Sequence, residues 1–283
     1  MDPTKPSDVR SLLATLDFKP SKVLGQNFLI DANIIDIIVK LGDIQPDDVV
    51  LEIGPGLGAL TSPLVARAKR VIAVEKDDVL AKHIAGYFPH ASHLELRHQD
   101  ALDLDYQMIF SSEGVRKVIS NLPYSVGSRM LMEIFACNPG PDRIVVTVQE
   151  EVADRLAAKP STKDYGLLGI CAQVDYETRI GKIISPNCFL PPPQIRSAVV
   201  VLERRKEERR LSVSRVAFRD LVRRLFSHRR KQMQSSLSRE FPHVSADRRA
   251  EALAAAGAND KDRPENLTVD QWIRLAAVIL TDH

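Results

Sequence analysis

The chain has 283 residues, is 44% hydrophobic and 27% charged, and carries a formal net charge of +2. This length is sufficient for one large domain and a smaller one, and the apolar fraction supports a buried core. The three cysteines are far apart and form no CxxC pair, which excludes a disulfide framework and a cysteine-based zinc site. No apolar leader and no run of ~20 apolar residues is present, so we expect a cytoplasmic monomer without metal or membrane contact.

The N-terminal part divides into an arm and a helix. Residues 1–21 hold three prolines around a short apolar patch, so we expect a flexible N-terminal arm. Residues 31–41 place isoleucines at helical spacing on one face, and Asp31 suits the N-cap position. This predicted helix begins a domain that we expect to span residues 22–205.

The strongest signal lies in the next segment, which combines a strand, a glycine-rich loop, a helix and a second strand. The strand is expected at 49–53, the loop at 54–58, the helix at 59–68 and the second strand at 71–75. Glycines allow the backbone to turn tightly and to approach a ligand closely. The unit therefore predicts a nucleoside-containing ligand, although the loop alone fits NAD as well as S-adenosylmethionine.

Two acids at strand ends are candidates for holding that nucleoside. Glu75 lies roughly 20 residues after the first glycine of the loop, a spacing at which a carboxylate accepts hydrogen bonds from both ribose hydroxyls. Asp100 follows a third strand and either accepts from the amino group of an adenine or serves as an ordinary helix cap.

Strands and helices continue to alternate as far as residue 150. This alternation predicts an α/β fold, namely a doubly wound, Rossmann-like sheet with helices on both faces. The last two strands have no helix between them, so we expect a terminal β-hairpin on the sheet. The later strands are expected at 94–99, 118–120, 144–148, 176–184 and 198–202.

The stretch Asn121-Leu122-Pro123-Tyr124 follows a short β-branched run, so we place it at the carboxyl end of a strand, where open α/β sheets bind ligands. An exocyclic amine on a base is a poor nucleophile because its lone pair is delocalised into the ring. The amide oxygen of Asn121, together with the carbonyl of Leu122 or Pro123, is suited to accept both amine hydrogens. Tyr124 offers a flat face on which a base stacks. The alternative is a turn with one buried tyrosine.

Basic residues concentrate near the C-terminal end. A helix predicted over 216–237 places apolar side chains on one face and arginines largely on the others, with acids almost absent. A solvated helix face is the ordinary explanation of such a run, but this imbalance favours nucleic-acid binding. Two more helices, near 247–256 and 269–280, predict a small all-α domain over 206–283 with Trp272 in its core.

In combination, these motifs resemble the ribosomal RNA adenine N6,N6-dimethyltransferase family, and its bacterial small-subunit (KsgA-type) members more closely than the erythromycin-resistance methylases. The occurrence of these motifs in the right order between residues 22 and 203 makes the resemblance specific. The resemblance rests on the stretches 25–29 (GQNFL), 52–58 (EIGPGLG), 121–124 (NLPY) and 189–193 (FLPPP), together with Glu75 and Asp100.

The resemblance implies a class I methyltransferase domain that uses S-adenosylmethionine as methyl donor. It implies N6-dimethylation of two adjacent adenosines in the 3′-terminal hairpin of 16S rRNA, within the small ribosomal subunit or its precursor. It further implies that the small helical domain contacts RNA. The residues expected in the cofactor site are Asn27, Leu29, Gly54, Gly56, Glu75, Asp100 and Asn121. Those expected at the target base are Asn121, Leu122, Pro123, Tyr124 and Phe189, with the last two rings enclosing it. Those expected on RNA are Arg219, Arg223, Arg224, Arg229, Arg230 and Lys231.

Four other functions compete with this hypothesis. A large-subunit adenine methylase of the macrolide-resistance type shares the chemistry, although Leu122 and the size of the basic domain favour the small-subunit enzyme. A non-catalytic ribosome-assembly factor shares the fold, but the motif positions are chemically intact. An NAD-dependent oxidoreductase leaves the 121–124 motif without a purpose. A DNA adenine methylase is excluded only by substrate tests.

Overall fold

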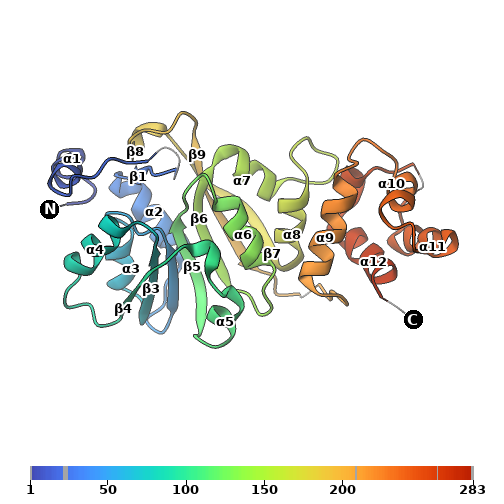
Figure 1. Ribbon diagram of the computed structural model, residues 1–283, viewed down its shortest axis with the longest axis horizontal. Coiled ribbons are helices and arrows are strands. Elements are labelled where there is room, and N and C mark those ends of the chain that lie inside the picture. The colour runs from blue at the N-terminus through green and yellow to red at the C-terminus, as the bar shows by residue number, and fades with distance from the viewer. Residues whose placement is uncertain (1, 22–24, 208, 260, 282–283) are drawn as a thin grey trace. The chain divides into compact units, whose positions relative to one another are not determined.

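The computed structural model describes residues 2–21, 25–207, 209–259 and 261–281 (Figure 1). The chain forms two compact units: the first is Met1–Ala153 with Thr178–Arg204, and the second is Asp154–Glu177 with Arg205–His283. The segment Asp154–Glu177 belongs to the second unit, whereas the sequence placed it inside a single domain over 22–205. Its side chains Tyr165 and Ile170 are buried in the core of the second unit, which explains the assignment.

The first unit is built on a seven-stranded sheet with the order β4-β3-β2-β5-β6-β9-β7. Strands β4, β3, β2, β5 and β6 are parallel, and β9 is antiparallel to β6. The predicted α/β fold is confirmed. The two strands expected as a terminal hairpin, β7 and β9, are neighbours at the end of the sheet, with the short helix Pro186–Cys188 between them in the chain. The strands are β2 (Val49–Ile53), β3 (Arg70–Glu75), β4 (Leu94–His98), β5 (Val115–Asn121), β6 (Arg143–Gln149), β7 (Tyr176–Ile184) and β9 (Ser197–Arg204).

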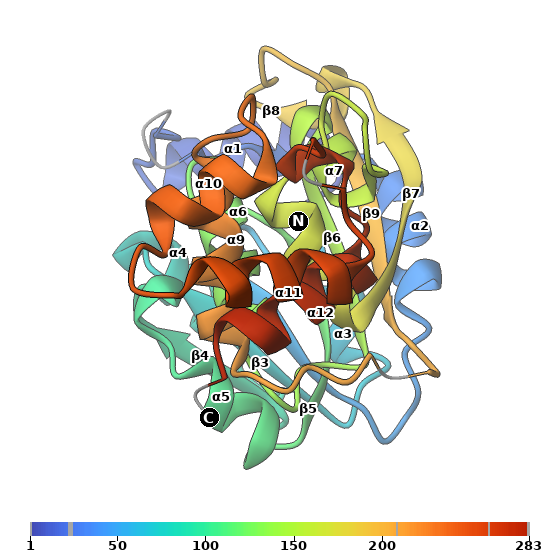
Figure 2. The same ribbon diagram turned by 90° about the vertical axis from the view of Figure 1, so that its right-hand side faces the viewer.

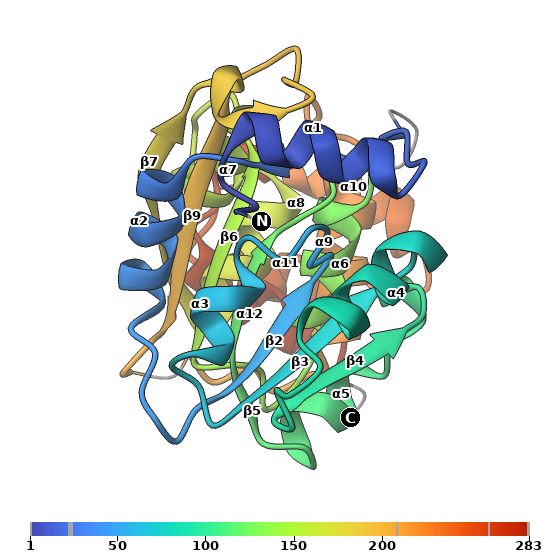
Figure 3. The ribbon, with the colours of Figure 1, turned by 90° about the vertical axis from the view of Figure 1, so that its left-hand side faces the viewer.

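Helices cover both faces of this sheet, which is why its central strands are continuous apolar runs. Side chains of α2 and α3 pack on one face in a cluster that includes Val50, Ile119 and Val145. Figure 3 shows α6 on the side of the strands opposite to α2. The helices of the first unit are α1 (Pro6–Thr15), α2 (Ala32–Gly42), α3 (Thr61–Val65), α4 (Asp78–Tyr87), α5 (Tyr106–Ser111), α6 (Gly127–Phe135) and the short η1 (Ala101–Asp103) and η2 (Pro186–Cys188), while α7 (Glu150–Ala157) begins in it.

Helix α1 replaces the flexible arm that the sequence predicted. Val9 and Leu12, three residues apart, lie on one face of the helix and are buried. They pack in a cluster with Phe28 and Leu80. The prediction of a loose arm is wrong for this segment, because the apolar face of the helix packs against apolar residues of the first unit.

A separate two-stranded sheet joins two distant parts of the first unit. Strand β1 (Phe28–Leu29) pairs antiparallel with β8 (Phe189–Leu190). The pairing brings the N-terminal GQNFL stretch to the segment that begins the FLPPP stretch. Two motifs separated by about 160 residues are therefore linked by backbone hydrogen bonds.

The second unit is helical, as predicted, and Figure 2 shows its helices α10, α11 and α12. Its core surrounds Trp272, which is fully buried. In the described residues, no helix is long and apolar enough to cross a membrane. The helices of this unit are α8 (Leu167–Asp175), α9 (Arg215–Phe226), α10 (Met233–Glu240), α11 (Ala246–Ala256), α12 (Val269–Ile279) and the short η3 (Pro264–Asn266).

The helix predicted over 216–237 is in fact two helices. Helix α9 ends at Phe226, a turn follows, and α10 begins at Met233. If α9 continued, the polar side chains of His228 and Arg229 would lie on the apolar stripe of the helix. The helix therefore ends before them, because they cannot be buried as its other stripe residues are. After the turn Met233 is fully buried, and its N–H donates to the carbonyl of Asp262.

Candidate active site

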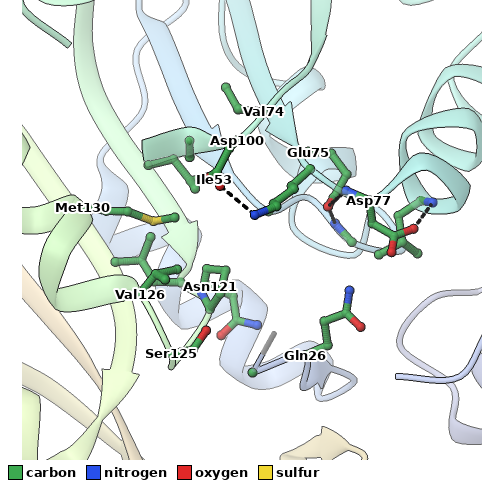
Figure 4. A pocket seen from close by; sticks show the side chains of 18 of the residues that line it. Gln26, Ile53, Val74, Glu75, Asp77, Asp100, Asn121, Ser125, Val126 and Met130 are labelled. Atoms are coloured by element: carbon green, nitrogen blue, oxygen red, sulfur yellow. Dashed lines mark hydrogen bonds and ion pairs between the residues drawn. The ribbon is translucent and has the colours of Figure 1, made fainter. Parts of the chain in front are cut away.

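The first unit contains a cavity of about 380 Å³ at the carboxyl ends of β2, β3, β4 and β5, which we call the main cavity. Ligands bind at this edge in open parallel sheets because the loops that follow the strands converge there. Figure 4 shows Val126 and Met130 on the side of Asn121, and Asp77 beside Glu75. The lining comes from residues 25–28, 53, 54, 56, 74–77, 80, 100–102, 121–123, 125, 126, 129 and 130.

The glycine-rich loop forms one wall of the main cavity. Gly54 and Gly56 have φ values of +70° and +59°, a region that favours glycine. A Cβ on Gly56 would lie 3.1 Å from the ring of Phe28. The loop therefore follows a path, close to its neighbours, that a residue with a side chain would strain.

Glu75 ends strand β3 and is held by two backbone N–H groups. Its Oε1 accepts from Asp77 at 2.9 Å and its Oε2 accepts from Gly56 at 3.3 Å. The carboxylate is 7% exposed, and burial raises its pKa. Each oxygen retains a lone pair, so the group is oriented and still able to accept from a pair of hydroxyls.

Asp100 caps a helix, which is one of the two roles predicted for it, and it also lines the main cavity. Its Oδ1 accepts from the N–H of Leu102 at 2.9 Å, at the start of η1. Its Oδ2 accepts from Nζ of Lys76 at 2.7 Å. The hydrogen bond from Lys76, followed by that from Leu102, lowers the pKa of Asp100.

Asn121 ends strand β5 with its amide oriented by a neighbouring carbonyl. Its Nδ2 donates to the backbone oxygen of Asn27 at 3.1 Å. Its Oδ1 is buried and has no hydrogen-bond partner among the described residues. Asn121 lines the main cavity, and its buried, unpaired oxygen is costly to bury unless a ligand satisfies it.

The backbone after Asn121 distinguishes two candidate carbonyls. The oxygen of Pro123 accepts from Val126 at 3.3 Å and from Gly127 at 2.9 Å, where α6 begins. The oxygen of Leu122 makes no hydrogen bond to any described residue, while the Leu122 N–H donates to Thr147. Of the two carbonyls that the sequence left open, that of Leu122 is the free one.

Tyr124 and Phe189 meet edge to face. Their ring centroids are 6.4 Å apart at an interplanar angle of 72°, and the Tyr124 hydroxyl is 2.5 Å from Oγ of Ser197. Phe189 is only 2% exposed, because its pairing with Leu29 in β1 and β8 holds the ring in the core. The resemblance implied that the Tyr124 and Phe189 rings enclose the target base, but the Phe189 ring is buried in this structure and the two rings form no open slot for a base.

Leu29 also lies outside the lining of the main cavity. It is 4% exposed and packs in the core cluster beneath α2. The other predicted cofactor residues, from Asn27 to Asn121, all line the cavity. Gln26, Lys76 and Arg129 also line the cavity, although none of them was among the predicted cofactor residues. Gln26 lies inside the GQNFL stretch and Lys76 directly follows Glu75, so both carried a positional signal.

The basic residues predicted to bind RNA are partly neutralised by acids from elsewhere in the second unit. Arg224 pairs with Glu240 at 3.2 Å and Arg229 pairs with Glu265 at 2.6 Å. Arg223 pairs with Asp220 within α9, and Arg219, on the same helix, has an electrostatic interaction with Cys171. Arg230 and Lys231 are exposed in the turn between α9 and α10, and neither forms an ion pair with a described residue.

Comparison with known proteins shows which family the chain belongs to. The profile of the family "Ribosomal RNA adenine dimethylase" matches residues 17–280. The chain is 40% identical to Ribosomal RNA small subunit methyltransferase A of Streptomyces coelicolor, over 96% of this chain and 95% of the relative. It is 34% identical to the protein of the same name from Clostridium acetobutylicum, over 96% and 98%.

Two solved structures share the fold. A dimethyladenosine transferase from Plasmodium falciparum matches with a TM-score of 0.74 and 22% identity, covering 86% of this chain and 94% of that one. The 23S rRNA methyltransferase ErmE matches with a TM-score of 0.66 and 26% identity, covering 89% and 99%. Since the family profile and the relatives each span nearly the whole chain, the protein belongs to the ribosomal RNA adenine dimethylase family.

Proposed function

We propose that this protein dimethylates N6 of two adjacent adenosines in the 3′-terminal hairpin of 16S rRNA, with S-adenosylmethionine as donor, during maturation of the small ribosomal subunit. The observation that carries the proposal is the unpaired, buried Oδ1 of Asn121 in a cavity that also holds the carboxylates of Glu75 and Asp100. The name that the relatives share, small subunit methyltransferase, supports the choice of substrate.

The main cavity fits the donor in size and in chemistry. Its volume of about 380 Å³ lies in the range of small-ligand sites. Glu75 would hold the ribose hydroxyls and Asp100 the adenine amino group, while the backbone of Gly54 and Gly56 leaves room for the methionine end. When bound, S-adenosylmethionine supplies a methyl group already activated by a positively charged sulfur.

The acceptor amine would be aligned by two oxygens that the protein leaves free. Oδ1 of Asn121 and the carbonyl of Leu122 each accept one hydrogen of the adenine N6 amine. This arrangement favours the pyramidal nitrogen that attack requires, so catalysis is positioning and electrostatic stabilisation without a strong base. A monomethylated amine has one hydrogen left, and either oxygen is able to receive it.

The target base must leave its stack to reach this pocket, at a cost of about a few kcal/mol. We assign base stacking to Tyr124, which is partly exposed next to the 121–123 segment. Phe189, being buried, would act by holding the ring of Tyr124 from the side. Stacking on one aromatic ring contributes roughly 1–3 kcal/mol.

We assign methyl transfer to the first unit and RNA contact to the second. The turn between α9 and α10 offers Arg230 and Lys231 to phosphates, because these two charges are not already paired with described acids. The paired arginines of α9 contribute less to RNA binding, since each would have to exchange an acid for a phosphate.

The experiment that tests the function is methyl transfer from labelled S-adenosylmethionine to undermethylated small subunits, large-subunit RNA and duplex DNA, followed by nucleoside analysis. N6,N6-dimethyladenosine in the small subunit alone is the expected result. Label in large-subunit RNA would favour the second candidate, a 23S rRNA methylase, which the likeness to ErmE supports. Binding of small subunits without transfer would point to an assembly factor.

A further inference from the structure

We propose that the segment Gly25–Asn27 locks the side-chain amide of Asn121 in the one orientation that accepts a substrate amine. The inference rests on the proposed function, because it assigns a positioning role at the same site. The backbone of this segment, and not its side chains, would control the catalytic geometry.

The lock is a hydrogen bond whose direction is dictated by chemistry. A side-chain amide presents nearly the same shape after a 180° flip about its last bond, with NH2 and oxygen exchanged. The group beside Asn121 Nδ2 is the backbone carbonyl of Asn27, 3.1 Å away, and a carbonyl only accepts. The NH2 must face Asn27, so the oxygen is the atom left without a partner.

The flipped amide would be unsuitable for the reaction. It would present two donors to an amine that must itself donate, and it would set the Asn121 oxygen against the Asn27 oxygen. Without the Asn27 carbonyl, both orientations become populated, and only one is competent. The segment thus increases the fraction of molecules whose Asn121 amide has the orientation that aligns the amine.

Close packing holds the carbonyl in place. Gly25 has φ +67°, and a Cβ built on it would lie 2.9 Å from the backbone nitrogens of both Tyr124 and Ser125. The segment therefore lies directly on the loop that follows Asn121, at a distance that only glycine permits. Two independent contacts, the hydrogen bond and this approach, join the same two pieces of chain.

The segment is also braced on both sides. The N–H of Ser21 donates to Oε1 of Gln26 at 2.7 Å, and Nδ2 of Asn27 donates to the carbonyl of Gly25 at 3.2 Å. On the other side, β1 begins at the next residue, Phe28, and pairs with β8. The Asn27 carbonyl is consequently held between two anchored points.

Substitution of Gly25 with alanine tests the lock, because the added Cβ must push the segment off the loop. We expect the single-turnover rate of methyl transfer to small subunits, at saturating donor, to fall by about 100-fold, because the displaced segment moves the Asn121 amide by about 1 Å as well as freeing it to flip; flipping alone would cost only about twofold. The dissociation constant of S-adenosylhomocysteine, measured by calorimetry, should change by a much smaller factor than the rate, although residues 25–28 line the same cavity, because most of the rate loss comes from the geometry of the amide and not from donor binding.

The matched control is Gly114→Ala. Gly114 has φ +74°, similar to that of Gly25, but a Cβ on it would meet nothing within 4 Å. It carries the same backbone strain without displacing a neighbour, so its transfer rate should equal that of the wild type. Equal rates in both variants, or equal losses in both, would overturn the lock.

A second measurement is independent of catalysis and is made on the wild-type protein. In the wild-type protein labelled with 15N-asparagine and saturated with S-adenosylhomocysteine, the Asn121 side-chain amide is assigned from the spectrum of Asn121→Ser. One of its protons should exchange slowly with solvent, as expected for a hydrogen bond to Asn27. Two rapidly exchanging protons would overturn the proposal even if the enzyme is active. If the wild type methylates none of the three acceptors while the slow proton is present, the proposed function fails and the lock stands.

Discussion

Nζ of Lys76 lies 2.7 Å from Oδ2 of Asp100, so the ends of the neighbouring strands β3 and β4 are joined by an ion pair at the edge of the main cavity. The lysine side chain is 60% exposed and the carboxylate 24%. The carboxylate thus faces the cavity while its charge is already balanced by the protein.

The first prediction concerns this carboxylate. Asp100→Asn keeps an oxygen that caps η1 but removes the charge. We expect the affinity for S-adenosylhomocysteine to fall about tenfold in a calorimetric titration, because charged acceptors form stronger hydrogen bonds. Lys76→Met is the matched control, since it removes the partner and leaves the acceptor. An equal loss in the control would show that the ion pair, and not the acceptor, supports binding.

The second prediction concerns pH and the buried acid Glu52 on β2. Burial raises its pKa from 4.5 to about 8, and Oε2 has no hydrogen-bond partner among the described residues. Between these values the folded protein retains a proton that the unfolded chain releases. The contribution of Glu52 to the free energy of unfolding is therefore fully present below about pH 4.5 and decreases as pH rises toward 8, at about 1.4 kcal/mol per pH unit.

Glu52→Gln should remove this decrease, because a neutral amide replaces the protonated acid. Urea unfolding at pH 6 and pH 8, followed by circular dichroism, measures the difference. Asp47→Asn, at an exposed position, is the control and should keep the wild-type pH dependence. If Glu52→Gln showed the same pH slope as the wild type, Glu52 would not be the group responsible.

The third prediction separates catalysis from binding at Asn121. Asn121→Ala removes the side-chain acceptor that we assign to the amine, and we expect the transfer rate to fall by roughly 10²–10³-fold, as when one stabilising group is removed from an active site. The affinity for S-adenosylhomocysteine should change far less. Rapid-quench single turnover and calorimetry on the same preparation provide both values, and equal losses would argue against the assigned role.

The fourth prediction concerns the turn between α9 and α10. Replacing Arg230 and Lys231 with Gln should weaken binding to small-subunit RNA and reduce the slope of log K against log salt by about 1–2. The control is Lys69→Gln with Lys82→Gln, which removes the same charge from exposed positions of the first unit. Filter binding at several salt concentrations measures the slopes, and equal slopes for the two double variants would contradict the assignment.

The fifth prediction concerns Tyr124. Tyr124→Phe keeps the ring and loses the hydrogen bond to Ser197, whereas Tyr124→Ala loses the ring itself. We expect the alanine variant to lose about 1–3 kcal/mol of stabilisation in kcat/KM for small subunits, as for one stacked base. The phenylalanine variant should lose less. The idea of stacking fails if the two variants are equally impaired.

The sequence alone was sufficient to predict the parallel sheet, the glycine-rich loop and the helical second unit. These depend on local regularities: apolar runs in β2 and β3, glycines between them, and an apolar stripe on α12. It also placed Glu75, Asp100 and Asn121 at strand ends, because parallel strands bring their carboxyl ends to one edge. The positions of these groups followed from topology without any knowledge of side-chain contacts.

Only the tertiary structure decided which atoms are free. The pairing of Phe189 with Leu29 buried a ring that seemed available, and acids from α10 and η3 neutralised arginines of α9 and the turn after it. The Asn27 carbonyl, distant in sequence, selected the orientation of the Asn121 amide. Burial, ion pairing and hydrogen-bond direction depend on partners brought together by folding, and sequence spacing carries no information about such partners.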